Sequence, residues 1–174
     1  MEGDVYIIDG YNLMHADEEL ASLMEEDLEA ARGSLVREVS EFAAREGTRV
    51  RLVFDAGGRP GGAQTERHGA GLEVTYTAAG QSADAYIEKL AYQKPAAGGA
   101  VIVVTGDYAQ QRIVSGAGLL RMSPREFFAR LAESREGLRQ AMRPGRPGGR
   151  KVRLADRISE DARSALERLK GEKQ

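Results

Sequence analysis

Val5-Tyr6-Ile7-Ile8-Asp9-Gly10 is a short apolar run that ends abruptly at an aspartate and a glycine. Such a run predicts a buried β-strand that stops at Asp9. Three other runs of similar character predict further strands: Arg49–Phe54, Leu72–Thr77 and Ala100–Val104. A fifth, shorter strand is predicted at Leu119–Met122.

Helices are predicted between these strands. Apolar residues recur at helical spacing near residues 25–46, and Gly47 is placed to end that helix. Ser82 can cap a second helix, and a short helix is predicted after Asp107. Ser123-Pro124-Arg125-Glu126 combines a capping box with proline at the first helical position, which predicts another helix start. Strands that alternate with helices predict an α/β fold, with a mainly parallel central sheet and helices on both faces.

The length of 174 residues suits one domain with a short appendage. Hydrophobic residues make up 41% of the chain and charged residues 30%, which is typical of a globular protein and not of a disordered one. We expect residues 1–142 to form the domain. Residues 143–155 are rich in Pro, Gly and Arg and predict a basic linker. Residues 156–174 carry one apolar stripe at helical spacing and predict a C-terminal helix.

Several features of the composition bear on location. The chain has no cysteine, which excludes a disulfide framework and thiolate metal sites and suits a reducing compartment. The N-terminus is acidic and leads directly into a strand-like run, unlike a secretory signal. No apolar run approaches the roughly 20 residues that a membrane span needs. We therefore expect a cytoplasmic protein without a membrane segment.

Three of the predicted strands lead into an aspartate. Asp9 and Asp55 follow their strands directly, and Asp107 follows Thr105-Gly106. Ligands of an open parallel sheet bind at the carboxyl ends of its strands, so we expect these side chains at one edge of the sheet. Any single aspartate in such a place is more often a turn residue or a helix cap. Three that point to the same edge make coincidence a poorer explanation.

Two further carboxylates follow the third strand. Asp84 lies in the first turn of the helix that Ser82 caps, and Glu88 lies four residues later on the same helical face. Carboxylates gathered in a small space repel one another unless a cation neutralises them. Oxygen ligands without histidine favour a hard ion such as Mg²⁺ or Mn²⁺ over zinc. Phosphodiester hydrolysis uses such sites, because metal ions lower the pKa of a bound water and stabilise charge on the reacting oxygens.

Four motifs together resemble the YacP-like branch of the NYN domains, which are PIN-like nucleases. They are Asp9-Gly10-Tyr11-Asn12, Val53-Phe54-Asp55-Ala56, the stretch from Ser82 to Glu88, and Val104-Thr105-Gly106-Asp107. The resemblance covers about residues 4–134, and the tail from Arg153 onward is similar to the closing helix of that branch. No single motif is decisive, but four in the right order at domain-scale spacing are specific.

The resemblance implies a PIN-like three-layer sandwich and a metal-dependent ribonuclease, expected to be an endoribonuclease. It places the metal at Asp9, Asp84 and Asp107, and Asn12 matches an asparagine that supports the catalytic site. Asp55 also occupies a motif position and can bind the metal or lie just behind its ligands.

Two weaker candidates and one departure complete the motifs. Glu88 and Thr105 are the weaker candidates. Gly106 stands where a serine is common, which removes a hydroxyl ligand but leaves the carboxylate of Asp107. The departure therefore does not put catalysis in doubt.

The glycine-rich stretch Ala56–Gly71 is predicted to be a loop beside this edge. It carries Arg59 and Arg67, which could grip an RNA backbone. A merely flexible connection is the competing explanation, and the length of the loop slightly favours a functional one.

Charge is distributed unevenly along the chain. Residues 1–134 carry 21 acidic and 13 basic side chains, whereas residues 135–174 carry 6 and 12. An acidic body with a basic tail fits a metal site with a phosphate-attracting arm, and a solvated linker and helix fit equally well. If the tail binds RNA or the ribosome, we expect the contacts at Arg146, Arg150 and Lys151.

Other readings of the acidic motifs are weaker. A receiver-type phosphorylation domain would need a lysine at the end of the last strand, where Arg121-Met122-Ser123 stands. A phosphatase with a nucleophilic aspartate would need a second acid at Tyr11, and the sequence contains no P-loop. The serious rival is a catalytically silent RNA-binding module with the same fold. A pure binder of polyanions gains nothing from a negative edge, so the retained acids favour the enzyme.

Overall fold

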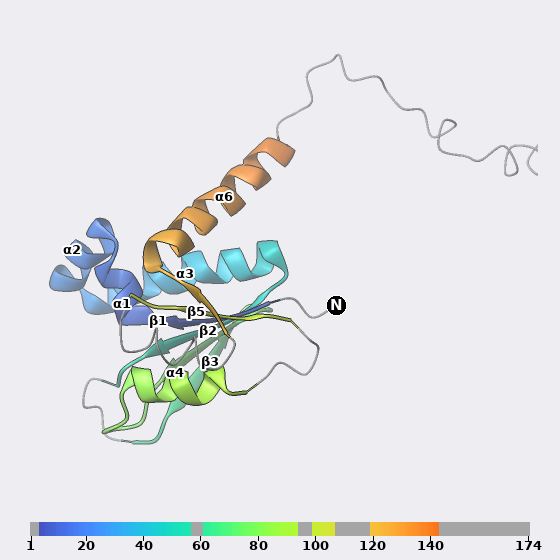
Figure 1. The fold of residues 1–174 in the computed structure, drawn as a ribbon. Helices are drawn as coiled ribbons and strands as arrows, with labels where there is room; N and C mark the ends of the chain where they lie inside the picture. The colour runs from blue at the N-terminus through green and yellow to red at the C-terminus, as the bar shows by residue number, and fades with distance from the viewer. Residues whose placement is uncertain (1–3, 57–60, 94–98, 107–118, 143–174) are drawn as a thin grey trace, which may run out of the picture. The chain divides into compact units, whose positions relative to one another are not determined.

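The computed structural model describes residues 4–56, 61–93, 99–106 and 119–142 (Figure 1). The chain divides into two units, Met1–Arg139 and Gln140–Gln174. All elements below lie in the first unit, except for the last residues of α6. The predicted helix after Asp107, the predicted linker 143–155 and the predicted C-terminal helix 156–174 lie outside the described residues.

A six-stranded sheet forms the centre of the first unit, in the order β3-β4-β2-β1-β5-β6. Every described pairing in it is parallel except that of β3 with β4. This confirms the predicted mainly parallel sheet. The strands are β1 (Val5–Asp9), β2 (Arg49–Phe54), β3 (Gln64–His68), β4 (Leu72–Tyr76), β5 (Val101–Val104) and β6 (Leu120–Met122).

The described helices cover both faces of the sheet and make three layers (Figure 1). Alternate residues of β1 divide between two cores, because successive side chains of a strand point to opposite faces. Tyr6 and Ile8 pack in the larger core with the helices on one face. Val5 and Ile7 pack in a smaller core with α4. The helices are α1 (Gly10–His15), α2 (Glu18–Glu26), α3 (Leu28–Glu46), α4 (Ala83–Ala91) and α6 (Pro124–Met142).

Local sequence signals set several helix ends where they were predicted. Gly47 ends α3 in the left-handed conformation, with φ of 61°. The Ser82 hydroxyl accepts from the Ala85 N–H at the start of α4. At the start of α6, Ser123 Oγ accepts from Glu126 N at 3.3 Å, and the Glu126 carboxylate accepts from Ser123 N at 2.6 Å. The predicted capping box is therefore present.

The prediction that Ala56–Gly71 is wholly a loop is wrong. β3 occupies Gln64–His68 and runs antiparallel to β4, with the Thr65 and Thr75 hydroxyls 2.9 Å apart. The strand is polar and mostly exposed, so it shows no apolar run that the sequence could reveal. Its reversed direction places Arg67 opposite Glu73, near the start of β4. Arg67 therefore lies toward the amino ends of the parallel strands and not beside the predicted site.

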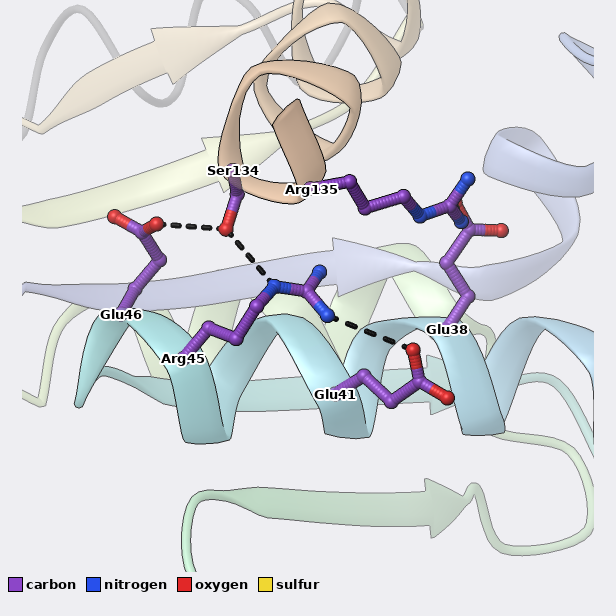
Figure 2. Close-up of polar contacts among 6 residues, drawn as sticks. All are labelled: Glu38, Glu41, Arg45, Glu46, Ser134 and Arg135. Atoms are coloured by element: carbon purple, nitrogen blue, oxygen red, sulfur yellow. Dashed lines mark hydrogen bonds and ion pairs between the residues drawn. The ribbon is translucent and has the colours of Figure 1, made fainter. Parts of the chain in front are cut away.

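A polar network joins α3 to α6 on the larger-core side (Figure 2). Ser134, which is buried, accepts from Arg45 Nε at 3.1 Å and donates to Glu46 Oε1 at 2.7 Å. Arg135 pairs with Glu38 beside it. The network holds α6 over α3, where Phe127 and Leu131 enter the same core as Phe42. None of the helices in the described part of the chain has the length and apolar character of a membrane span.

Glu38 gives this network a pH dependence. Burial raises the pKa of its carboxyl above the ordinary value of 4.5, and the Arg135 charge opposes that rise. A carboxyl with a raised pKa in the folded state binds its proton more tightly there than in the unfolded chain. Its contribution to stability is therefore lost as the pH rises from 4.5 through the folded pKa.

Glu38→Gln should remove this dependence. We expect the variant to gain stability relative to the parent as the pH rises above 4.5, because glutamine carries no charge to desolvate. Arg135 is half exposed and keeps water as a partner. Urea unfolding of both proteins at pH 4, 5.5 and 7 measures the difference. A variant that loses stability relative to the parent over this range would show that ion pairing outweighs burial.

Candidate active site at the carboxyl ends of the strands

The strand register brings the ends of β1, β2 and β5 level with one another. Asp9 pairs with Val53, and Ile8 pairs with Val104. Asp9 follows Ile7 by two residues, and Ile7 lies in the core that α4 covers. The two-residue period of a strand therefore places Asp9 on the α4 side of the sheet. Val53 of β2 and Val103 of β5 lie in the same core as Ile7. Asp55 and Thr105 each come two residues after one of them, as Asp9 comes two residues after Ile7. Asp9, Asp55 and Thr105 thus have equivalent positions at the ends of three adjacent strands.

Asp9 performs the structural role that a strand-end aspartate commonly has. Its Oδ1 accepts from the Asn12 N–H at 3.0 Å, which makes Asp9 the N-cap of α1. The two roles are compatible, since a carboxylate has two oxygens and about four acceptor sites. The cap also fixes the carboxylate at the middle of the sheet, because β1 lies between β2 and β5.

The start of α4 carries Asp84 to the same side. Ala83 and Ile87 pack against Val5, Ile7 and Val53, so the helix lies on the Asp9 side of the sheet. Asp84 lies in the first turn and is exposed, where the helix dipole favours a carboxylate. Glu88 lies one turn later and is also exposed.

The end of β2 is tied to the end of β4, which positions Asp55. The Thr77 N–H donates to the Phe54 carbonyl at 2.9 Å, and the Ala56 N–H donates to the buried Thr77 hydroxyl at 3.0 Å. Asp55 lies between these two bonds and is half-buried. The backbone of Phe54 and Ala56, the two neighbours of Asp55, is therefore hydrogen-bonded to Thr77.

Asn12 links the ends of β1 and β5. Its side-chain oxygen accepts from the Gly106 N–H at 2.8 Å, while its own N–H donates to Asp9. A Cβ at Gly106 would lie 3.2 Å from that side-chain oxygen, so glycine suits this close approach. Asp107 follows at once but lies outside the described residues. The predicted supporting role of Asn12 thus has a physical basis in the bond to the residue before Asp107.

Asn12→Ala should loosen this link. We expect about a 10-fold loss of cleavage rate and a loss of about 1 kcal/mol of stability, because the hydrogen bond from the Gly106 N–H to the side chain of Asn12 in α1 disappears. Asn12→Asp keeps an acceptor oxygen at the same place and should recover most of the stability. Thermal melting and single-turnover cleavage of the two variants check this. A parent-like rate for Asn12→Ala would remove Asn12 from the site.

Arg32 on α3 was not among the residues predicted from the sequence. Its guanidinium is buried, donates to the Tyr11 hydroxyl, and lies 5.3, 5.7 and 5.6 Å from the ring centroids of Tyr11, Phe54 and Tyr76. Its guanidinium also pairs with Glu29. The three rings belong to the start of α1 and to the ends of β2 and β4, so Arg32 holds these three elements against α3. Its only sequence signal is its place three residues before the core residue Leu35, and nothing in the sequence marks the aromatic surroundings.

The predicted site is only partly within the described residues. Among those residues, no three acidic or histidine side chains lie close enough together to hold a metal ion. Asp107, a predicted ligand, is outside them. The described donors Asp9, Asp55 and Asp84 offer carboxylate oxygens alone, which fits a hard divalent ion. Of the predicted RNA contacts, Arg59, Arg146, Arg150 and Lys151 are also outside the described residues.

Comparison with known proteins identifies the chain. The model of the YacP-like NYN domain matches residues 6–171. The chain belongs to the YacP-like NYN domain family. An uncharacterized YacP protein of Bacillus subtilis is 34% identical over 125 residues, which cover 72% of this chain and 73% of that protein. NYN domains are PIN-like hydrolytic nucleases, so membership places the chain among nucleases.

Solved structures of the NYN family share this fold. A crystal structure of Rae1 (YacP) from Bacillus subtilis matches with a TM-score of 0.67 and 27% identity, over 97% of this chain and 89% of that one. A crystal structure of a tryptophan-to-leucine mutant of Rae1 matches with a TM-score of 0.68 and 26% identity, over 95% and 99%. The family match extends to residue 171 and so includes the basic tail.

Proposed function

We propose that this NYN domain is a metal-dependent endoribonuclease that hydrolyses RNA phosphodiester bonds at the carboxyl ends of its strands. The observation that carries the proposal is the placement of Asp9. It ends β1, one of the two middle strands of the sheet, on the side covered by α4, which carries Asp84 in its first turn. Asn12 joins Asp9 to the residue before Asp107. Asp9, Asp84 and Asp107 would hold Mg²⁺ or Mn²⁺, with Asp55 beside them.

Each residue of the site would have a distinct role in catalysis. When bound, the divalent ion lowers the pKa of a water and stabilises charge on the scissile phosphate. The Asp9 carboxylate at the end of β1 and the Asp84 carboxylate in the first turn of α4 would orient the reacting groups. Asn12 keeps the chain before Asp107 in register with Asp9. Thr105 is fully buried and supports the end of β5.

The basic residues after 142 extend the proposal to the substrate. Their net positive charge favours RNA, and RNA on the ribosome is a candidate substrate, with Arg146, Arg150 and Lys151 as contacts. A linker at 143–155 followed by a helix at 156–174 would let this segment reach a phosphate backbone at some distance from the domain.

Metal dependence is the test of the proposal. Purified protein incubated with structured and unstructured RNAs should cleave with Mn²⁺ or Mg²⁺, lose the activity in EDTA and regain it when metal is added back. Cleavage that survives exhaustive chelation would exclude the metal mechanism. RNA binding without cleavage in any metal would favour the silent RNA-binding module.

A further inference from the structure

A groove runs along α4 on the side of the sheet that carries the candidate site. Two adjoining hollows of about 490 and 240 Å³ make it, and both are lined by Arg51, Glu73, Leu90 and Gln93. The larger hollow reaches Val5, Arg49 and Val101, which begin or adjoin the starts of three parallel strands. The smaller one reaches Thr75 and Tyr86, closer to the carboxyl ends. The groove therefore extends from the amino ends of the strands toward the end of α4 that carries Asp84 in its first turn.

The charge of the groove is opposite to that of the domain around it. Residues 1–134 carry eight more acidic than basic side chains. Among the residues that the structure describes, by contrast, those lining the groove include four basic side chains and one acid, Glu73. Glu73 lies between two of the arginines, 3.6 Å from Arg51 and 3.4 Å from Arg67. The basic side chains are Arg49, Arg51, Arg67 and Lys89.

The exposure of these groups suits an anionic ligand. The Arg67 side chain is 84% exposed although its Nε faces Glu73, and Lys89 is exposed on the neighbouring flank of α4. Arg51 Nε faces Glu73, and its Nη1 donates to Gln93 at 3.3 Å, so the movement of its guanidinium within the groove is limited. A guanidinium in a fixed position binds phosphate oxygens as a fork, with little loss of side-chain freedom.

We propose that this groove binds a single-stranded segment of the RNA on one side of the cleavage position, with its phosphates on Arg51, Arg67 and Lys89. The inference rests on the proposed ribonuclease function. A strand that reaches Asp9 must continue away from it, and this basic path begins beside the helix that carries Asp84. The half-buried ring of Tyr86 and the Thr65 hydroxyl line the same path and can contact bases or sugars.

Two matched double variants test the groove. Arg67→Gln with Lys89→Gln removes two exposed charges from it. Arg37→Gln with Arg139→Gln removes two exposed charges from α3 and α6, on the other side of the sheet, and changes the net charge equally. Binding of a short unstructured RNA to the full chain is measured by fluorescence anisotropy in EDTA at several salt concentrations. Melting curves confirm that both variants are folded.

The groove variant should bind the RNA about 10-fold more weakly and lower the slope of log affinity against log salt by about 1.4, which is about 0.7 per lost phosphate contact. The α3–α6 variant should stay within about 2-fold of the parent. Equal effects of the two variants, or a parent that binds no RNA, would overturn the groove. Cleavage by the parent in Mn²⁺ is scored separately. If the parent binds RNA through the groove but does not cleave it, the proposed ribonuclease function is wrong. If the parent cleaves RNA but the two variants bind it equally well, only the proposed role of the groove is wrong.

Discussion

Asp9→Asn should lower the single-turnover rate of RNA cleavage by at least about 100-fold, which equals roughly 2.7 kcal/mol of transition-state stabilisation. Asp9 ends β1, one of the two middle strands of the sheet, and its carboxylate is fixed by the cap that it makes on α1. Asparagine caps helices as well as aspartate does, so the substitution removes charge and spares the fold. The melting temperature should stay unchanged or rise slightly, because repulsion among carboxylates falls.

Asp27→Asn is the matched control for this substitution. Asp27 caps α3 through an equivalent bond, from the Ala30 N–H at 3.0 Å, but it does not follow a strand of the sheet. Its substitution should leave the cleavage rate within about 2-fold of the parent. A similar fall in rate for both variants would mean that the loss at Asp9 reflects capping and not chemistry.

The other acids should rank in a definite order. Asp84→Asn should lower the rate by at least about 100-fold, because a helix start holds its carboxylate on the Asp9 side of the sheet. Asp107→Asn should also be severe. Milder losses are expected for Asp55→Asn and Glu88→Gln. If instead Glu88→Gln proves as damaging as Asp84→Asn, the metal lies farther along α4 than we propose.

Gly10→Ala should destabilise the domain by about 2–3 kcal/mol. A Cβ at Gly10 would lie 2.3 Å from a ring carbon of Phe54, which is fully buried and adjoins Asp55. The ring cannot move freely, since it packs on Tyr11 and Tyr76. The overlap therefore displaces either Phe54 or the start of α1, and both adjoin a candidate carboxylate.

Two companion variants make the Gly10 test specific. Gly33→Ala places the same methyl group on α3 with nothing within 4 Å, and should raise stability by about 0.5–1 kcal/mol through helix propensity. In a Phe54→Leu background, Gly10→Ala should cost clearly less than in the parent, because the ring edge is gone. Urea unfolding of the set measures these differences. Equal stability of Gly10→Ala and Gly33→Ala would contradict the close contact.

The parts of the fold that the sequence predicts are those determined by local chemistry. The apolar run before Asp9, the glycine after α3 and the capping box at Ser123 each act within a few residues. β3 could not be predicted in this way, because its polar residues become a strand only by pairing with β4. The short helices α1 and α2 were also missed. They begin at the caps Asp9 and Asp17, and each capping side chain is individually ambiguous.

In the candidate site, too, some features follow from the sequence and others depend on contacts between distant residues. The convergence of Asp9 and Asp55 follows from parallel strands, whose ends meet at one edge. The bond from Gly106 to Asn12 joins residues 94 positions apart and leaves no pattern in the sequence. The aromatic surroundings of Arg32 likewise come from a strand, a helix start and a second strand. Arg67 was predicted to contact RNA because of its charge, but its position in the fold depends on the direction of β3, which the sequence does not reveal.

The proposed function requires that Asp9 holds the metal ion with which the protein cleaves RNA. The most direct test is a Mn²⁺ titration of single-turnover cleavage by the parent and by Asp9→Asn. We predict that the parent requires Mn²⁺, and that the variant needs a higher Mn²⁺ concentration for half-maximal rate and stays at least about 100-fold slower at saturation. Superimposable titration curves for the two proteins, or parent cleavage independent of Mn²⁺, would contradict the claim.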